Sequence, residues 1–437
     1  MTQTLLKNAQ ALLLENDTGA FVKPATHQYP HQWNWDAAFV ALGLSYFDPA
    51  RAKQEVFSLL AGQWANGMIP HILYHHGASD YFPTPDFWQT DAACQDVGFA
   101  TSGLTQPPIL ATCIRKMLPQ FADRAQRLEF LSAVYPKLLA WHRWFYSARD
   151  PDGTGLVAII HPWESGNDNS PRFSGALQAL RPERVPAYSR KDRAHVDPEE
   201  RPFEEDYVRY MYLIGVYRDL AWNDEAIYAQ APFLVQDEQF NVILHRANQD
   251  LRALALEAGQ PADTSEIDTW LAKGQQAISQ LWNEEAGLYF SRDVRTGEPL
   301  KVASAHALTP LFAGLPDAEQ AERLVEHLRN PESFAPGEGS RFFTPTLAKN
   351  SPHHDPRRYW AGPVWINMNW LLWLGLKAYG YAELAATLRE HSLELVGTSG
   401  FVEYYDPRDG SACGGRGFSW SAALAIHMLN EDAQAGP

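Results

Sequence analysis

The chain has 437 residues, 45% of them hydrophobic and 20% charged, a composition typical of a soluble globular protein with a large core. Its net charge of −16 argues against nucleic acid or an anionic membrane as the main partner. Cys94, Cys113 and Cys413 are too few and too scattered for a disulfide framework, and no stretch has the apolar length of a signal peptide or membrane helix, so we expect a reduced, cytoplasmic protein.

Helical periodicity dominates the chain. In chain order, the apolar spacing predicts helices at 2–15, 36–47, 50–66, 105–118, 124–148, 205–223, 236–258, 262–283, 303–314, 316–329, 363–378, 380–397 and 418–430. Strand patterns are few and short, at 155–161, 287–293 and 401–406, and each lies near a glycine, as in small hairpins. Since the helices follow one another without a linker or a repeat of fixed period, we expect one closed helical toroid over 1–437; two or three separate bundles are the alternative.

Two long irregular segments interrupt this pattern, at 169–204 and 329–358, and both are rich in proline, arginine and glycine. Loops of this length inside a compact domain are uncommon and are usually functional lids or disordered. Because each lies beside a motif of aromatic and acidic residues, we interpret both segments as lids.

The 15 tryptophans stand out because many lie in loop-like motifs. Segments 29–39, 161–173, 359–370 and 401–410 draw on tryptophan, tyrosine, glycine and acidic residues, each containing three of these four kinds, mostly where a loop meets a helix. In a helical toroid such junctions converge at one end and form a funnel. A funnel lined by aromatic rings suits a flat or ring-shaped ligand, sugars included.

Three carboxylates within these motifs have both a structural and a functional interpretation. Asp36 at a helix start is favoured by the helix dipole and could also bind sugar hydroxyls. Asp168 in "GNDNSP" fits a turn, yet its aromatic surroundings would raise its pKa, as a general acid requires. Glu403 in "FVEYYDP" either faces solvent from a strand or acts from a buried aromatic face. A carboxylate pair is what glycoside hydrolysis uses.

Other chemistries have weaker support in the sequence. The histidines form no HExxH motif, and His161 with Glu164 is a weak metal-ligand pair. The chain has no GxSxG elbow, phosphate-binding loop or dinucleotide fingerprint, so we expect neither a metal nor an organic cofactor.

Six motifs together resemble the inverting α-glycosidases of glycoside hydrolase family 63 and their trehalase relatives, and most of all the compact bacterial mannosylglycerate and glucosylglycerate hydrolases. They are "HQWNWD", "SGLTQPP", "WESGNDNSP", "YWAGPVWINMNW", "EYYDP" and "GFSWSAAL", in the order and rough spacing of that family. The resemblance covers nearly the whole chain. It implies an (α/α)6 barrel, with Asp168 as general acid and Glu403 as general base.

The resemblance also implies a substrate site. The residues expected there are Tyr29, Trp33, Trp35, Asp36, Tyr81, Gln106, Trp163, Gly166, Arg201, Tyr207, Tyr359, Trp360, Trp365 and Trp420. Among them Arg201 and Tyr207 match positions expected to bind a glycerate carboxylate, for which a bidentate guanidinium is well suited. Arg416 is the alternative for that role. The chain departs from the family pattern at Ala361, where many relatives have arginine.

We therefore expect an enzyme that hydrolyses a small α-glycoside with inversion, releasing glucose or mannose from D-glycerate. Trehalose or short α-glucosides are alternative substrates. A non-catalytic sugar-binding toroid is an alternative of another class, and a histidine-dependent epimerase or lyase using His161 and His306 is a third. The orientation of the sugar hydroxyls and the oligomeric state stay open.

Overall fold

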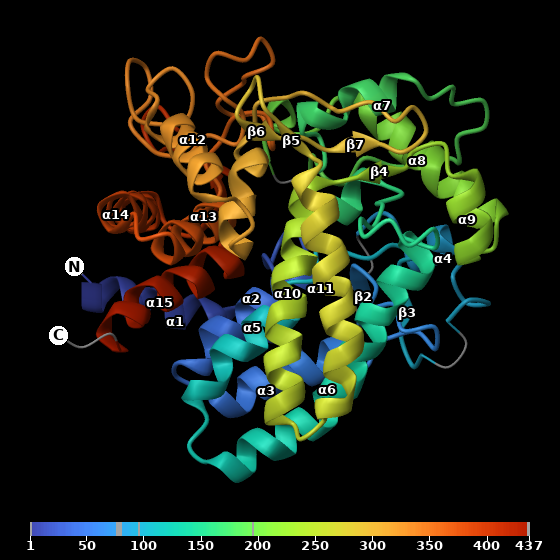
Figure 1. Ribbon diagram of the computed structural model, residues 1–437, viewed down its shortest axis with the longest axis horizontal. Helices are drawn as coiled ribbons and strands as arrows, with labels where there is room; N and C mark the ends of the chain where they lie inside the picture. Colours follow the sequence, from blue (N-terminus) through green and yellow to red (C-terminus); the bar gives the residue numbers. More distant parts are fainter. Residues whose placement is uncertain (1, 76–80, 95–96, 195, 435–437) are drawn as a thin grey trace.

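The structure is a computed structural model that describes residues 2–75, 81–94, 97–194 and 196–434 (Figure 1). Its core is a closed ring of helices. Within the described residues the ring consists of α2 (Asn34–Ser45), α5 (Leu110–Met117), α10 (Glu238–Glu257), the 3-10 helix η7 (Ala305–Ala313), α13 (Ile366–Ala378) and α15 (Ser419–Gln434). Each helix contacts the next, and α15 closes the ring against α2. Every residue of α2 and η7 is buried, as expected for helices that are apolar on all sides.

A second layer of helices surrounds this ring. Its members among the described residues are α1 (Thr2–Glu15), α3 (Pro49–Leu60), α6 (Arg124–Trp144), α11 (Thr264–Ser279), α12 (Ala318–Arg329) and α14 (Ala382–Ser399). Among them α12 is clearly amphipathic: it begins at a capping box formed by Asp317 and Gln320 and buries a stripe of Ala321, Leu324, Val325 and Leu328. The two layers form an (α/α)6 barrel, so the predicted toroid is confirmed.

Shorter elements decorate the ends of the barrel. They are α4 (Pro85–Trp88), α7 (Ser174–Gln178), α8 (Glu204–Asp219) and α9 (Asp224–Gln230), the π-helical turn η2 (Phe145–Arg149), and the 3-10 turns η1 (Leu118–Gln120), η3 (Pro162–Ser165), η4 (Pro171–Phe173), η5 (Pro198–Glu200) and η6 (Pro261–Asp263). The strands β1 (Gln32–Trp33), β2 (Ile72–Tyr74) and β3 (Ala100–Thr101) form an antiparallel sheet. Three antiparallel pairs complete the set: β4 (Val235–Gln236) with β7 (Arg292–Asp293), β5 (Trp282–Asn283) with β6 (Leu288–Tyr289), and β8 (Val402–Tyr405) with β9 (Ala412–Arg416).

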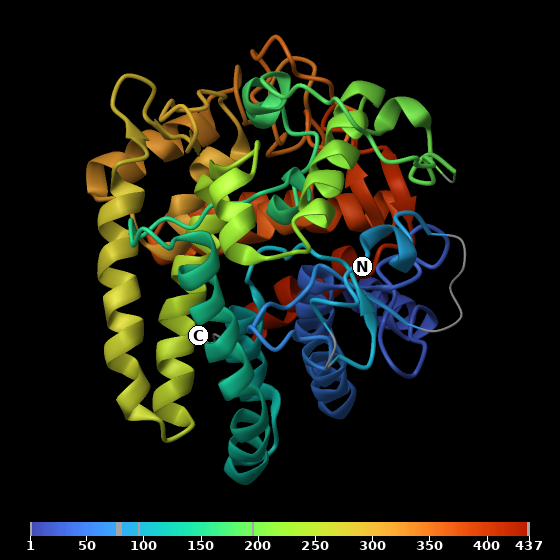
Figure 2. The same cartoon turned by 90° about the vertical axis from the view of Figure 1, so that its right-hand side faces the viewer.

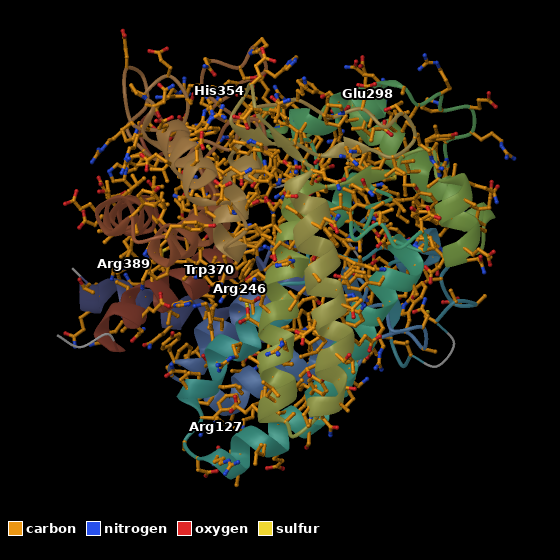
Figure 3. All side chains as sticks on the ribbon, viewed as in Figure 1. Arg127, Arg246, Glu298, His354, Trp370 and Arg389 are labelled. Atoms are coloured by element: carbon orange, nitrogen blue, oxygen red, sulfur yellow. The ribbon has the colours of Figure 1, made fainter. Side chains whose placement is uncertain are left out.

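The loops of the segments 169–204 and 329–358 lie toward the same end of the barrel, uppermost in both ribbon views (Figures 1 and 2). Figure 3 shows His354 of the second segment at this end, Trp370 among the inner helices, and Arg127 at the opposite end. In the described part of the chain, no helix has the length and apolarity needed to cross a membrane.

Several predicted boundaries shift for identifiable reasons. The helix expected at 105–118 begins at Leu110, because the prolines at 107 and 108 lack the amide hydrogen that an inner turn requires. The element at 303–314 is a 3-10 helix with Pro310 inside it. The helix expected at 50–66 ends at Leu60, and α9 was not predicted.

The strand predictions fare unevenly. Residues 401–406 contribute β8 to a hairpin, as expected. Residues 287–293 instead supply two strands that pair with different partners, and 155–161 forms no hairpin but a single bridge between Ile159 and Val235. The segment 169–204 is not wholly irregular, since it contains η4, α7 and η5.

Candidate active site

The predicted site residues lie around one pocket, which has a volume of about 840 Å³ with its opening to solvent included. Every residue expected around the substrate lines it, together with both candidate catalytic carboxylates: Tyr29, Trp33, Trp35, Asp36, Tyr81, Gln106, Trp163, Gly166, Asp168, Arg201, Tyr207, Tyr359, Trp360, Trp365, Glu403 and Trp420. These residues are spread over almost the entire chain, so the barrel is what brings them together.

The pocket also includes residues that the sequence did not single out: Pro24, Gln28, His71, Phe82, Asp192, Pro202 and Phe418. Pro202 and Phe418 adjoin predicted positions, so their neighbourhood was a usable signal. Asp192 lies in a long loop without a flanking pattern, and its partner Arg190, which donates to it at 2.8 and 2.7 Å, is visible only in the structure.

Glu403 is held in β8 with its carboxylate buried and surrounded by donors. The Tyr29 hydroxyl donates to Oε1 at 2.8 Å, and the backbone N–H of Gly415 donates to Oε2 at 2.8 Å. The Arg201 guanidinium lies 3.3 Å from both carboxylate oxygens. All three are hydrogen-bond donors, so they hold both carboxylate oxygens of Glu403 in place.

Asp168 stands at the tip of a turn. Gly166 and Asn169 on either side of it have φ values of +69° and +66°, and the Asn169 N–H donates to the Tyr210 hydroxyl at 2.9 Å. A Cβ at Gly166 would lie 2.5 Å from the Trp35 ring, so glycine lets the turn approach the pocket wall. The turn interpretation is therefore correct, and the turn presents Asp168 to the pocket.

The electrostatics of Asp168 differ from those of Glu403. Burial raises the pKa of Asp168 from 3.8 to about 7; the Arg201 cation opposes this shift, and the Glu403 charge adds to it. Asp36, in the first turn of α2, is also buried, and burial raises its pKa well above the ordinary value. Asp36 lies in the first turn of a helix and lines the pocket, so its position is compatible with both interpretations.

Arg201 is buried between aromatic rings and carboxylates. Its guanidinium lies 4.1 Å from the centroid of the Tyr359 ring, and Nη2 donates to the Tyr29 hydroxyl at 3.0 Å. The segment that carries it is fixed by Glu200, which accepts from the Gly414 N–H at 2.9 Å and pairs with Arg357. Arg416, the alternative carboxylate ligand, is exposed and does not line the pocket.

Aromatic rings form much of the wall. Trp360 and Trp365 stack at 3.7 Å with an angle of 9° between their planes, and Tyr404 continues the stack at 4.7 Å from Trp365. Trp35 meets Trp420 edge to face at 5.2 Å. Such a packed wall is rigid, and flat apolar surfaces of this kind suit the faces of a sugar ring.

Residues 29–421 match the domain described as "Mannosylglycerate hydrolase MGH1-like glycoside hydrolase domain". The chain belongs to this family of glycoside hydrolases. The hydrolase is thus an enzyme of family 63 type, and the prediction of a glycosidase is confirmed.

Individual relatives align along nearly their full length. The mannosylglycerate hydrolase of Thermus thermophilus is 47% identical over 96% of this chain and 99% of its own. The glucosylglycerate hydrolase of Mycolicibacterium hassiacum is 33% identical over 97% of each chain. The crystal structure of the GH63 mannosylglycerate hydrolase from Thermus thermophilus in complex with Tris and D-glycerate superimposes with a TM-score of 0.91, covering 97% of this chain and 99% of that chain at 46% identity. A periplasmic trehalase of Xanthomonas axonopodis matches only 43% of this chain, at 30% identity.

Glu164, considered above only as a weak metal-ligand partner of His161, has a structural role in the hydrolase. It is fully buried and pairs with Arg149 at 2.9 Å. It also accepts from the N–H groups of Ile160 at 2.8 Å and Thr105 at 3.3 Å. These bonds fix the segment that leads into the turn carrying Asp168, and Glu164 is not part of the pocket lining.

The histidines of the epimerase or lyase alternative are also outside the pocket lining. His161 accepts from the Trp163 N–H at 3.0 Å through Nδ1, and burial lowers its pKa to about 3. His306 is buried within η7, and burial lowers its pKa well below the ordinary value. The described residues contain no cluster of three or more histidine, cysteine, aspartate and glutamate side chains that could hold a metal ion.

Proposed function

We propose that this hydrolase cleaves the α-glycosidic bond between mannose or glucose and D-glycerate, with inversion, in the cytoplasm. The observation that carries the proposal is the contrast between two carboxyl groups in one pocket. Asp168 has its pKa raised to about 7 by burial, while Glu403 is surrounded by hydrogen-bond donors. Environments that separate an acid from a base in this way are typical of glycosidases.

In this proposal Asp168 protonates the glycosidic oxygen as the bond to the anomeric carbon breaks. Glu403 removes a proton from the water that attacks the anomeric carbon from the opposite face of the sugar ring. Tyr29 and the Gly415 N–H hold the Glu403 carboxylate in one orientation, so that its lone pairs face that water.

We assign the sugar to the aromatic wall with Asp36 and Gln106, and the aglycone to Arg201 and Tyr207. Among the described residues that line the pocket, Arg201 is the one with a permanent positive charge, as a carboxylate-bearing aglycone requires. The relatives named mannosylglycerate and glucosylglycerate hydrolase, and the relative crystallised with D-glycerate, support this aglycone. Ala361, where many relatives have arginine, is buried next to Trp360 and is not among the residues that line the pocket, so the glycerate assignment rests on Arg201 and Tyr207.

We further propose that the chain works as one barrel domain whose segments 169–204 and 329–358 cover the substrate. The first segment supplies Asp192, Arg201 and Pro202 to the pocket, and the ion pair between Glu200 and Arg357 joins it to the second.

The test is proton NMR of the products released from α-mannosylglycerate, α-glucosylglycerate and trehalose. We expect turnover of one or both glycerate substrates, with the β-anomer of the free sugar appearing first. Turnover of trehalose alone would replace the glycerate assignment with a trehalase, and an initial α-anomer would exclude inversion. Asp168→Asn and Glu403→Gln variants with full activity would remove the catalytic assignment.

A further inference from the structure

Arg172 is a buried cation close to the catalytic turn that the mechanism above does not use. It follows Asp168 by four residues, in η4, and is 2% exposed. Its Nη2 donates to Oδ1 of Asn167 at 3.0 Å, so it spans the turn with Asp168 at the tip. Asn167 is itself fully buried, and its carbonyl accepts from the Ser170 N–H at 3.1 Å.

The other side of the Arg172 guanidinium contacts the inner ring of helices. Nη1 lies 2.7 Å from Oδ2 of Asp237 and 3.0 Å from Oε2 of Glu238, where α10 begins. Asp237 also caps this helix, since its Oδ1 accepts from the Phe240 N–H at 2.7 Å. A single buried side chain thus connects the turn that carries Asp168 to a rigid inner helix.

Arg172 supplies the positive charge that the buried groups around it lack. Asp237 and Glu238 are both buried carboxyl groups, and burial raises the pKa of Asp237 to about 7 against the attraction of Arg172. His306, the remaining ionisable group here, is kept neutral by burial, and the Arg172 charge adds to that effect. Removing Arg172 leaves both carboxyl groups without the cation that offsets their burial, which is strongly destabilising at the base of the turn.

We propose that Arg172 is a positioning residue, which holds the turn so that Asp168 reaches the glycosidic oxygen. The inference rests on the proposed role of Asp168 as general acid. Since Arg172 does not line the pocket, it acts only through the turn. A shift of about 1 Å in a catalytic group can lower the rate by about 100-fold, which sets the expected effect.

The experiment compares two substrates that differ in their need for the acid. A glycerate α-glycoside has a poor leaving group that must be protonated, whereas the α-glycosyl fluoride of the same sugar loses fluoride without a full proton transfer. We expect Arg172→Met to lower kcat/KM for the glycoside about 100-fold and to leave the fluoride within about threefold. Arg172→Lys keeps the positive charge next to Asp237 but lacks the second nitrogen that donates to Asn167, so we expect it to restore part of the activity on the glycoside.

Two variants keep the test decisive. Asn167→Ala removes the tie to the turn while Arg172 keeps both carboxylates, and we expect the same selective loss even if Arg172→Met does not fold. Arg51→Met is the matched control. Arg51, on α3, is a buried arginine that pairs with Asp17 at 2.8 Å and with Glu55 at 2.9 Å. Neither carboxylate lines the pocket. It should lower thermal stability and leave the ratio of the two rates unchanged.

The outcomes separate this inference from the proposed function. The Asp168→Asn variant must itself keep its kcat/KM for the glycosyl fluoride. If it loses activity on both substrates equally, the acid assignment is wrong and the inference that rests on it is wrong too. If Asp168→Asn spares the fluoride while Arg172→Met and Asn167→Ala slow both substrates alike, or neither, only the positioning role is overturned.

Discussion

Replacing Asp168 by asparagine should abolish most hydrolysis and at the same time stabilise the fold at neutral pH. The carboxyl has an ordinary pKa of 3.8 and a pKa of about 7 in the folded protein, mainly because burial penalises its charged form. That difference corresponds to about 4 kcal/mol of free energy that the ionised group costs the folded state. Asparagine has nearly the same shape and carries no charge, so the variant avoids this cost.

The sign of the effect follows from proton linkage. Below pH 3.8 the carboxyl is protonated in both the folded and unfolded states, and the substitution changes stability little. Between pH 3.8 and about 7 the unfolded state ionises while the folded state holds its proton, so the wild-type protein loses stability as pH rises. Above about pH 7 the full penalty of about 4 kcal/mol applies, and the asparagine variant has its largest advantage.

Thermal unfolding followed by calorimetry at several pH values measures this advantage. An unfolding entropy of about 2 cal/mol/K per residue makes 1 kcal/mol worth about 1 °C in a chain of 437 residues, so we expect Asp168→Asn to raise Tm by about 4 °C at pH 8. The increase should shrink toward zero near pH 4. Hydrolysis of the glycoside should fall by about 10²- to 10⁴-fold, the usual contribution of a general acid.

Asp192→Asn is the matched control, because Asp192 lines the same pocket but has the opposite electrostatics. Burial raises its pKa, yet the Arg190 hydrogen bond and the Arg201 charge outweigh that effect and lower it overall. Its stabilisation is present at neutral pH and disappears on acidification, so its removal should lower Tm at pH 8. An unchanged or lower Tm for Asp168→Asn at pH 8 would refute the claim that this carboxyl is held in an unfavourable environment.

Three further predictions concern the same pocket. Tyr29→Phe removes the 2.8 Å hydrogen bond to the Glu403 carboxylate, worth about 1.5–3 kcal/mol, and should lower kcat/KM about 10- to 100-fold in steady-state assays; an unaffected rate would mean that Glu403 needs no such support. Gly166→Ala forces a residue with a side chain to φ +69° against Trp35 and should lower both Tm and kcat, whereas a neutral effect on both would show that the turn can relax. The kcat/KM for the glycoside should fall above about pH 7 as Asp168 loses its proton, and a profile that is flat to pH 9 would contradict its role as acid.

Much of the fold could be predicted because both layers of the barrel follow from hydrophobic periodicity. Inner helices such as α13 are apolar on all sides and outer ones such as α12 are apolar on one face. We expected a closed toroid, but periodicity could not show which helices close it, because the contact of α15 with α2 joins opposite ends of the chain. The pairing of the short strands was equally hidden, since two-residue strands such as β4 and β7 have no periodicity of their own.

The pocket lining could be predicted through whole motifs, but the partners of each charge could not. Arg201 and Glu403 are 202 positions apart, and the contact between them depends on where the segment carrying Arg201 is tied down by Glu200. A charged residue in a loop has many possible partners, and only the fold selects one. For the same reason, Asp192 and its partner Arg190 were missed.

Glu164 and Asp168 show most clearly what decides between structure and chemistry. They are four residues apart in one motif, and both are acidic residues next to glycine, serine or asparagine. The Glu164 carboxylate pairs with Arg149 and accepts hydrogen bonds from backbone N–H groups, so its contacts serve to hold the chain. Asp168 forms no ion pair among the described residues; the Arg201 charge and a backbone hydrogen bond offset burial only in part, so its pKa stays at about 7. A carboxyl group that the protein has buried without pairing it directly to a cation can keep its proton near neutral pH and is available to give it to a substrate.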